Sequence, residues 1–430
     1  MRKILLVGQG GREHALLQKL HADAPDAEFF ITRGNGGTSS LATPLPLDPS
    51  DASALAAWAE ANGIDLAVVG PEGPLVEGIT DQFVRHGLAV FGPSRDAALI
   101  ESSKAYAKSL MRRAGVPSAA FERFTELADA EAYIRERAGA LVVKASGLAA
   151  GKGAIVCDDR DEALEAARAM LRDHTFGAAG SEIVIEERLE GDELSFFCLT
   201  DGRDAVVMRA AQDHKRIGEG DTGANTGGMG AYAPVVLDTP ELRAQVLRDV
   251  VQPTLAALEE DGRRFRGLLY AGIMLAADGP RVIEFNARFG DPETQTLLPL
   301  LRSSLLEPLQ AIAAGGSIAG LALDWRDDAA LTTVLAASGY PGPVRKGDPI
   351  RIPPELESAD DLFLCHAGTR REDGRLVTDG GRVLAVTAVA PTLDEAAQRA
   401  RAAAAAIEFD GKQYRRDIGW RELERHARAS

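Results

Sequence analysis

The sequence predicts a multidomain protein with α/β and α+β parts that begins with a doubly wound parallel sheet. Over residues 1–100, short apolar strands alternate with helical patterns, and each strand ends in a glycine-rich loop, as in parallel sheets covered by helices. From about residue 120 onward, strands and helices follow in a mixed order. A chain of 430 residues has room for roughly two to four domains.

Composition and charge narrow the class of protein. The chain is 45% hydrophobic and 26% charged, as ordinary globular proteins are. Its net charge of −16 argues against a nucleic-acid-binding surface, and no apolar run approaches the ~20 residues that span a bilayer. Cys157, Cys198 and Cys365 lie far apart without metal-ligand spacing, so we expect reduced core residues in a cytoplasmic protein.

The N-terminal sheet is predicted from strands at residues 4–7, 65–69 and 89–91. Ligands of such sheets bind beyond the carboxyl ends of the strands. The loop after the first strand carries Gly8 and Gly10, but Glu13 stands where a dinucleotide-binding loop has its third glycine, so NAD is not expected. A phosphate of another ligand can approach the backbone N–H groups at the start of the next helix. A structural tight turn is the alternative interpretation.

A glycine- and alanine-rich segment at residues 144–153 joins two predicted strands, at 141–144 and 154–157. It is not a P-loop, because Gly153 follows Lys152 and no hydroxyl is available for Mg²⁺. We predict a flexible flap that closes over a triphosphate, with Lys144 reaching in from the strand below. An ordinary mobile hairpin is the alternative. Helices are predicted around it at residues 104–114, 131–137 and 161–171.

An acidic segment at residues 186–193 follows a predicted strand at 183–187. Its carboxylates can accept hydrogen bonds from ribose hydroxyls, and its backbone can pair with an adenine edge. A solvated charged linker is the alternative.

Residues 282–285 predict a buried strand, after a hairpin turn at 278–279. Side chains two apart on a strand share a face, so Glu284 and Asn286 are expected to point the same way. A carboxylate beside an amide oxygen forms half a cage for a hard cation such as Mg²⁺, and Arg288 can reach anionic oxygen next to it. Solvated polar residues at a strand end are the alternative.

A long polar, glycine-rich loop covers residues 212–232. A compact domain rarely carries such a loop without a use, and its basic residues and N–H groups suit a phosphorylated, hydroxyl-bearing substrate. His214 lacks metal-ligand spacing and is predicted to be an ordinary hydrogen-bonded histidine. Farther on, short strands such as 331–335 alternate with turns before an alanine-rich helix over 393–407.

In this order along the chain, these segments resemble the phosphoribosylamine–glycine ligases (glycinamide ribonucleotide synthetases), a family of the ATP-grasp superfamily. The resemblance covers the whole chain and rests on residues 10–15, 144–153, 225–230 and 288–295. It implies a Rossmann-like pre-ATP-grasp domain, an ATP-grasp small lobe with a phosphate flap, a large lobe with the metal and substrate site, and a C-terminal domain. These domains are expected at residues 1–103, 104–191, 192–327 and 328–430.

The resemblance implies a reaction in which ATP, glycine and 5-phosphoribosylamine give glycinamide ribonucleotide, ADP and phosphate, in de novo purine (IMP) biosynthesis. The family phosphorylates the glycine carboxylate, and the amine then attacks the glycyl phosphate. ATP is the cosubstrate, with Mg²⁺ or Mn²⁺ as the metal. We expect a cytoplasmic monomer without nucleic-acid or membrane partners, in transient contact with neighbouring purine-pathway enzymes.

The resemblance also implies residue roles. Arg288 and Lys144 would be catalytic, with Arg288 stabilising the transferring phosphoryl group, and Glu284 and Asn286 would hold the metal. The expected ATP-binding residues are Lys104, Lys144, Gly151, Lys152, Gly153, Glu186, Glu187, Leu189 and Glu193. The expected substrate-binding residues are Gly10, Gly11, Arg12, Glu13, Asp213, Lys215, Asn225, Thr226, Gly227, Gly228, Met229, Gly230, Arg288 and Asp291.

Some alternatives stay open. The strand expected to pair with the metal strand, residues 272–275, offers no carboxylate, so the metal must rely on ATP phosphates and water, and the number of ions is open. Ser102, Ser146 and Ala224 replace residues common in the family and are expected to touch no proposed ligand. Rival functions are another ATP-grasp purine-pathway ligase, which carboxylates or formylates a ribonucleotide, and a nucleotide-binding module without turnover.

Overall fold

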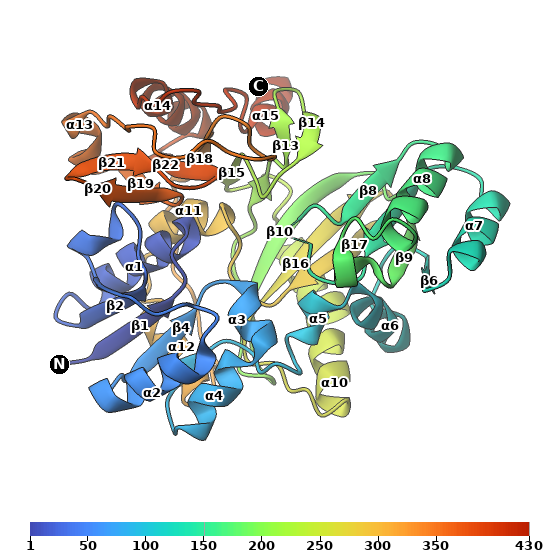
Figure 1. Cartoon of the computed structure of the whole chain (residues 1–430), viewed down its shortest axis with the longest axis horizontal. Helices are drawn as coiled ribbons and strands as arrows, with labels where there is room; N and C mark the ends of the chain where they lie inside the picture. Colours follow the sequence, from blue (N-terminus) through green and yellow to red (C-terminus); the bar gives the residue numbers. More distant parts are fainter. Residues whose placement is uncertain (150, 430) are drawn as a thin grey trace.

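The parallel sheet at the N-terminal end has the strand order β3-β2-β1-β4-β5 in the computed structural model, which describes residues 1–149 and 151–429 (Figure 1). Its strands are β1 (Lys3–Val7), β2 (Glu28–Thr32), β3 (Thr43–Leu45), β4 (Leu66–Val69) and β5 (Val90–Phe91). The helices of this part are α1 (Gly11–Asp23), α2 (Ala52–Asn62), α3 (Glu72–Glu77), α4 (Ile79–Arg85) and α5 (Leu99–Ser102). Neighbouring strands pair in parallel, so β1 and β4 present their carboxyl ends, where ligands bind, at the same edge.

The sequence interpretation missed β2 and β3 in this sheet. Strand β3 contains Pro44, which has no N–H to donate, and such a residue argues against a strand in a sequence. The proline is tolerated because β3 lies at the edge of the sheet and pairs with β2 alone.

A smaller lobe, green and teal in Figure 1, is built on the antiparallel sheet β6-β9-β7-β8. Its elements are α6 (Lys104–Ala114), β6 (Phe121–Phe124), α7 (Leu127–Glu136), β7 (Leu141–Ala145), β8 (Ala154–Cys157), α8 (Arg160–Leu171) and β9 (Ile183–Glu187). Ala130 and Ile134 of α7 share a core with Val143 and Ile185 of the sheet. Helix α7 begins earlier than predicted because Ala130, one turn before Ile134, belongs to the same buried face.

The larger lobe contains the antiparallel sheet β11-β10-β16-β17. Its strands are β10 (Asp192–Thr200), β11 (Ala205–Val207), β16 (Gly267–Ala276) and β17 (Gly279–Asn286), and its helices are α9 (Pro240–Val246), α10 (Gln252–Glu260), α11 (Glu293–Leu297) and α12 (Leu306–Ala313). The predicted hairpin turn joins β16 to β17. A bulge interrupts this pairing, because Val282 pairs with Ile273 and Glu284 with the adjacent Gly272. Bulges often lie beside active sites, where they redirect side chains.

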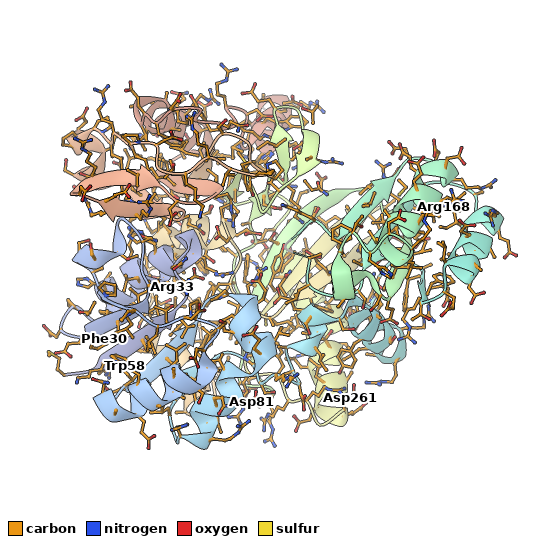
Figure 2. The ribbon with its side chains drawn as sticks, in the orientation of Figure 1. Phe30, Arg33, Trp58, Asp81, Arg168 and Asp261 are labelled. Carbon is orange, nitrogen blue, oxygen red and sulfur yellow. The ribbon has the colours of Figure 1, made fainter. Side chains whose placement is uncertain are left out.

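Helix α6 connects the two lobes through contacts with α10. Tyr106 Oη donates a hydrogen bond of 2.8 Å to Asp261 Oδ2, just after α10, and Arg113 Nη2 donates one of 2.8 Å to Asp261 Oδ1 (Figure 2 labels Asp261). Because α6 begins at Lys104, these contacts help to fix the position of that lysine.

The third large sheet has the order β12-β15-β18-β22-β19 and crosses the boundary expected near residue 327. Its strands are β12 (Gln212–Asp213), β15 (Gly230–Ala233), β18 (Ala329–Ala336), β19 (Leu362–His366) and β22 (Arg382–Ala390). The ends of the polar loop are therefore strands in one sheet with the C-terminal part of the chain. The remaining elements are β13 (Arg216–Gly218), β14 (Thr222–Asn225), α13 (Pro354–Glu357), β20 (Thr369–Glu372), β21 (Arg375–Thr378), α14 (Leu393–Ala406) and α15 (Trp420–Ala429).

The cysteines are placed as predicted, since Cys157, Cys198 and Cys365 are buried and free. Within the described parts of the chain, no helix is long and apolar enough to cross a membrane.

Candidate active site

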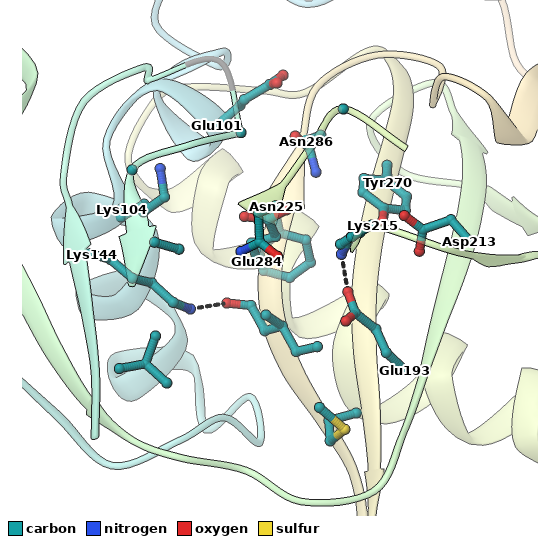
Figure 3. A pocket seen from close by; sticks show the side chains of 18 of the residues that line it. Glu101, Lys104, Lys144, Glu193, Asp213, Lys215, Asn225, Tyr270, Glu284 and Asn286 are labelled. Carbon is teal, nitrogen blue, oxygen red and sulfur yellow. Dashed lines mark hydrogen bonds and ion pairs between the residues drawn. The ribbon is translucent and has the colours of Figure 1, made fainter. Parts of the chain in front are cut away.

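A cleft of about 970 Å³ brings together residues from the smaller lobe, the larger lobe, the N-terminal part and the C-terminal part (Figure 3). The predicted site residues that line it are Arg12, Lys104, Lys144, Gly151, Gly153, Glu186, Glu187, Leu189, Glu193, Asp213, Lys215, Asn225, Thr226, Gly227, Glu284, Asn286, Arg288 and Asp291. The predicted site residues placed outside its lining are Gly10, Gly11, Glu13, Lys152, Gly228, Met229 and Gly230.

A pair of lysines on one wall shares a single buried carboxylate. Lys144 Nζ, on β7, donates hydrogen bonds of 3.0 Å to Glu186 Oε2 and 3.2 Å to the Ile283 carbonyl. Lys108 Nζ, on α6, lies 3.1 Å from the same Glu186 oxygen, and burial lowers the pKa of Lys108 to about 8. Two ammonium groups beside one carboxylate favour a polyphosphate. The sequence interpretation missed Lys108, although it follows Lys104 by one helical turn.

Lys104 begins α6 and is tied to the base of the flap. Its backbone N–H donates to the Ser146 carbonyl at 2.8 Å, and the next N–H, of Ala105, donates to Ser146 Oγ at 3.1 Å. Its Nζ lies 3.5 Å from the Gly147 carbonyl, and burial lowers its pKa. Ser146 therefore helps to position Lys104, while the expectation that it touches no proposed ligand stays a prediction.

The predicted flap joins β7 to β8, and Gly151 and Gly153 line the cleft. Ala150, within this segment, lies outside the described residues. Lys152 points elsewhere, since its Nζ donates a hydrogen bond of 2.9 Å to the Pro341 carbonyl in the C-terminal part. This hydrogen bond joins the flap to the C-terminal part, and the expected contact of Lys152 with ATP stays a prediction.

The end of the cleft near residues 186–193 offers an apolar surface. Leu189 lines it together with Val142, Val156 and Met274. Glu187 has fixed partners, because its Oε1 accepts a hydrogen bond of 3.0 Å from the Ala120 N–H and lies 3.3 Å from Arg281 Nη1. Apolar side chains of this kind are suited to a nucleobase.

Glu284 and Asn286 both line the cleft from β17, as their spacing predicted (Figure 3). Burial opposes ionisation of Glu284, but the charges of Lys215, Lys104 and Lys144 together lower its pKa. Asn286 Oδ1 accepts a hydrogen bond of 3.3 Å from Arg288 Nη2.

An ionised carboxylate and an amide oxygen fit a hard divalent cation whose other ligands are phosphate oxygens and water. Strand β16 offers no carboxylate opposite Glu284, since Gly272 is its partner. Among the residues described, no group of three or more His, Cys, Asp or Glu side chains is arranged to hold a metal ion.

Arg288 is held between two carboxylates of the N-terminal part. Its Nε lies 3.2 Å from Glu72 Oε2, and its Nη2 lies 3.3 Å from Glu101 Oε1. Burial opposes ionisation of Glu72, yet Arg288 and Arg12 lower its pKa to about 2, whereas burial raises the pKa of Glu101. The sequence interpretation missed both glutamates. The position of Glu72 just beyond the carboxyl end of β4 was a usable signal.

The polar loop lines the cleft up to residue 227 and leaves it after that residue. Asp213, Lys215 and the segment 225–227 line the cleft. Met229 is fully buried and its carbonyl accepts a hydrogen bond from the Val334 N–H, and Gly230 pairs with Thr333 of β18, so Met229 and Gly230 anchor the loop in the sheet. Lys215 Nζ forms an ion pair with Glu193 on β10.

Asp291 lies beside arginines from both ends of the chain. Arg382 Nη2, from β22, lies 3.1 Å from Asp291 Oδ2, and its Nη1 donates to the carbonyls of Asp291 and Gly227. Arg382, Arg12 and Arg288 together lower the pKa of Asp291 against the effect of burial. Nothing in the sequence near Arg382 indicated this role, because its neighbours form an ordinary apolar strand.

The glycine-rich loop after β1 adjoins this cluster. The Gly10 N–H donates a hydrogen bond of 2.6 Å to Glu13 Oε2, so Glu13 caps α1 from a buried position and does not line the cleft. Gly8 has a φ of +120°, where a side chain is strained, and a Cβ there would lie 2.6 Å from Glu13 Cγ. Among the residues expected in this loop, Arg12 is the one that reaches the cleft.

A buried arginine near the C-terminus holds the β13–β14 hairpin. Arg415 Nη1 donates hydrogen bonds of 2.8 Å to Asp221 Oδ1 and 3.1 Å to the Arg216 carbonyl, and its Nη2 donates one of 2.7 Å to Asp417 Oδ2. His214 is also buried here, and its Nε2 accepts a hydrogen bond of 2.9 Å from the Gly419 N–H. The interpretation of His214 as an ordinary hydrogen-bonded histidine is confirmed.

Two antiparallel sheets that enclose a lysine-lined cleft, beside a parallel N-terminal sheet, define the ATP-grasp class of protein. Comparison with known sequences identifies the family within this class. Residues 102–294 match the phosphoribosylglycinamide synthetase ATP-grasp (A) domain, residues 2–101 its N domain and residues 330–421 its C domain. The chain therefore belongs to the phosphoribosylglycinamide synthetase family.

Individual relatives agree with this assignment. The chain is 48% identical over 423 residues to a phosphoribosylamine–glycine ligase of Brucella melitensis, covering 98% of this chain and 99% of the relative. The crystal structure of a phosphoribosylamine–glycine ligase from Thermotoga maritima has a TM-score of 0.84 and 32% identity, covering 97% of this chain and 100% of the other. A more distant structure shares the fold. It is the biotin carboxylase domain of Hydrogenobacter thermophilus 2-oxoglutarate carboxylase, solved with MgADP. Its TM-score is 0.73 at 18% identity, and the match covers 99% of this chain and 98% of that one.

Proposed function

We propose that the chain joins glycine to 5-phosphoribosylamine in an ATP-dependent reaction that gives glycinamide ribonucleotide, ADP and phosphate in de novo purine biosynthesis. One observation carries the proposal: a single cleft has Lys104 and Lys144 on one wall, Asp213 and Lys215 on the opposite wall, and Glu284 and Asn286 between them (Figure 3). Arg288 and residues 225–227 line the same cleft. The similarity to phosphoribosylamine–glycine ligases over nearly the whole length supports it.

The first step that we propose is phosphorylation of the glycine carboxylate. A carboxylate is a poor electrophile at neutral pH, so phosphorylation supplies a leaving group. Lys104, Lys144 and Lys108 would neutralise the phosphates, and Arg288, oriented by its contacts with Glu72 and Glu101, would stabilise the charge of the transferring phosphoryl group. Positioning and charge stabilisation account for most catalysis in phosphoryl transfer.

Glu284 and Asn286 would hold a divalent cation, Mg²⁺ or Mn²⁺, together with phosphate oxygens. Such a cation, when bound, neutralises charge on the phosphates and orients them. ATP use with a divalent metal is general to ATP-grasp enzymes, and the choice between the two ions is part of the proposal.

In the second step, the amine of phosphoribosylamine would attack the glycyl phosphate from the wall that carries Asp213, Lys215 and Asn225. Arg12 and Arg382 beside Asp291 would suit the phosphate of that substrate, because guanidinium groups bind phosphate in a bidentate manner. Closure of the 144–153 flap would protect the acyl phosphate from water. A monomeric state and a cytoplasmic location stay predictions.

The test of this function is acceptor dependence. With no other amine added, ADP release should require glycine and phosphoribosylamine together, and ¹⁸O from the glycine carboxylate should pass into inorganic phosphate. ADP release driven by bicarbonate or formate would instead identify a rival ATP-grasp ligase, and ATP binding without ADP formation under any acceptor would identify a module without turnover.

A further inference from the structure

Formation of an amide from an amine and an acyl phosphate leaves one proton to be removed. The amine nitrogen bonds to the carbonyl carbon and becomes positively charged, and it must lose a proton as the carbon–oxygen bond to phosphate breaks. A positioned base typically contributes 10²–10⁴-fold to such a step. The cleft should therefore contain a carboxylate or other base whose lone pair is available on the acceptor side.

Most carboxylates that line the cleft have a fixed cationic or hydroxyl partner. Glu72 and Glu101 contact Arg288, and Glu186 contacts two lysines. Glu193 pairs with Lys215. On the acceptor side, Asp291 pairs with Arg382, Asp221 pairs with Arg415, and Glu293 Oε1 accepts a hydrogen bond of 3.1 Å from Ser195 Oγ.

Asp213 differs in its position and its surroundings. It ends the short strand β12, where it pairs with Ala231 of β15, and its side chain lines the cleft. In Figure 3 it lies on the wall opposite Lys104 and Lys144, with Glu284 and Asn286 between them. A group that receives the second substrate belongs on that wall, since the phosphate-binding lysines occupy the other.

The charges around Asp213 keep its carboxyl group basic. Burial raises its pKa to about 7, helped by Glu293 on α11 and Glu193 on β10, while Lys215 acts in the opposite direction. Tyr270 on β16 belongs to the same cluster, and burial raises its pKa well above the usual value, so it stays neutral. A carboxylate whose pKa lies near the working pH accepts a proton far better than one near 4 and is still largely ionised.

Resting on the proposed function, we propose that Asp213 is the base that accepts the proton from the attacking amine. The nitrogen lone pair forms the new C–N bond, the electron pair of the breaking C–O bond leaves with inorganic phosphate, and the N–H proton passes to a carboxylate oxygen of Asp213. Asp213 is then restored by loss of that proton to solvent or to the departing phosphate. Lys215, which forms an ion pair with Glu193, cannot be this base, because the charges of Glu193 and Asp213 raise its pKa against the effect of burial and keep it protonated.

The variant Asp213→Asn tests this role because it keeps the size and hydrogen-bonding capacity of the side chain and removes its basicity. We expect formation of glycinamide ribonucleotide to fall by about 10²–10⁴-fold. Activation of glycine should persist, measured as ADP release and glycyl hydroxamate when hydroxylamine replaces phosphoribosylamine. A parallel loss in both assays would overturn the inference, because Asp213 would then act before amine attack, and so would ligation within about threefold of the parent.

The pH dependence of kcat/KM gives a second test, because a purely structural role of Asp213 would not change it. A base must be deprotonated, so kcat/KM for phosphoribosylamine should fall as pH drops through about 7 in the parent protein. Protonation of the substrate amine also lowers kcat/KM at acid pH, and it does so equally for the parent and the variant. The part of the decrease at acid pH that disappears in Asp213→Asn therefore comes from the enzyme. Identical profiles for the two proteins would overturn the inference.

Matched variants distinguish a failure of the Asp213 proposal from a failure of the proposed ligase function. Asp238→Asn alters another buried carboxylate with a raised pKa, outside the cleft lining, and should leave both assays unchanged. Asp213→Glu restores a base and should recover part of the ligation rate. If the parent protein forms neither glycinamide ribonucleotide nor glycyl hydroxamate, the proposed function itself fails, which is a different result from selective loss in Asp213→Asn.

Discussion

The flap over the nucleotide side of the cleft and the loop on its acceptor side are held in opposite ways. Among the described residues of the flap beyond Ser146, Lys152 alone donates a side-chain hydrogen bond to the C-terminal part, and that bond is exposed. The β13–β14 hairpin of the acceptor side is held by Arg415, whose side chain is fully buried between Asp221 and Asp417.

This difference matches what each side must do. A segment that opens to admit ATP needs a low free energy of opening, and few buried contacts provide it. Under the proposed function, the surface that carries Asp213, Lys215 and Asn225 receives a reactive amine and needs fixed positions, because small misplacements reduce the rate strongly. The C-terminal part therefore contributes to both sides, through the exposed Lys152 bond to the flap and through a buried ionic cluster at the acceptor loop.

The largest expected effect comes from Arg288, which lies between the two sides. We expect Arg288→Ala to lower turnover by about 10²-fold or more, the scale for loss of a preorganised charge stabiliser. ATP affinity, measured by calorimetry, should stay roughly constant because the lysine wall is intact. Arg288→Lys keeps the charge but not the planar fork between Glu72 and Glu101, so it should recover only part of the rate. Unchanged turnover in the alanine variant would contradict the assignment.

A smaller effect, confined to the binding of phosphoribosylamine, is expected when Arg415 is replaced. Arg415→Met should raise the KM for phosphoribosylamine by about tenfold or more, a loss of about 1.4 kcal/mol or more in binding, while the KM for ATP stays within about twofold. Removing one partner of a buried ionic cluster also costs about 3–5 kcal/mol of stability, so kinetics should be measured well below the unfolding temperature.

A control for Arg415→Met is Arg351→Met. Arg351 pairs with Glu408 at 2.6 Å on the surface of the same C-terminal part, far more exposed than Arg415. Exposed pairs contribute little, so this variant should change neither KM nor stability measurably. An equal rise of both KM values in Arg415→Met would show that the hairpin is not specific to the acceptor side.

Local patterns predicted the elements of the fold that are long or strongly apolar. The strands around residues 4–7, 141–144 and 154–157 and the helix over 104–114 follow from periodicity alone, and the structure contains them as β1, β7, β8 and α6. Strand β12 could not be predicted, since it is the dipeptide Gln212–Asp213 and exists only because it pairs with β15. Short strands depend on distant partners, which a local pattern does not contain.

The candidate site follows the same rule. Lys144, Glu284, Asn286 and Arg288 stand in compact motifs, and the structure brings them together in the cleft. Glu101, Arg382 and Arg415 belong to no such motif, because their roles arise from contacts with residues far away in the sequence: Glu101 with Arg288, Arg382 with Asp291, and Arg415 with Asp221. Motifs predict the groups that line the cleft better than the groups that position them.

The smallest expected effect comes from Lys152, whose hydrogen bond to the Pro341 carbonyl is the flap's exposed tie to the C-terminal part. A net hydrogen bond contributes about 0.5–1.5 kcal/mol, so Lys152→Ala should weaken flap closure by at most about tenfold and raise the KM for ATP by a few-fold. Lys152→Arg, which can still donate to that carbonyl, should stay close to the parent. The effect should be absent from the KM for phosphoribosylamine. A loss of turnover as large as that of Arg288→Ala would mean that Lys152 contacts the reacting phosphate when the flap closes, and the contrast between a lightly held flap and a rigid acceptor loop would then have to be abandoned.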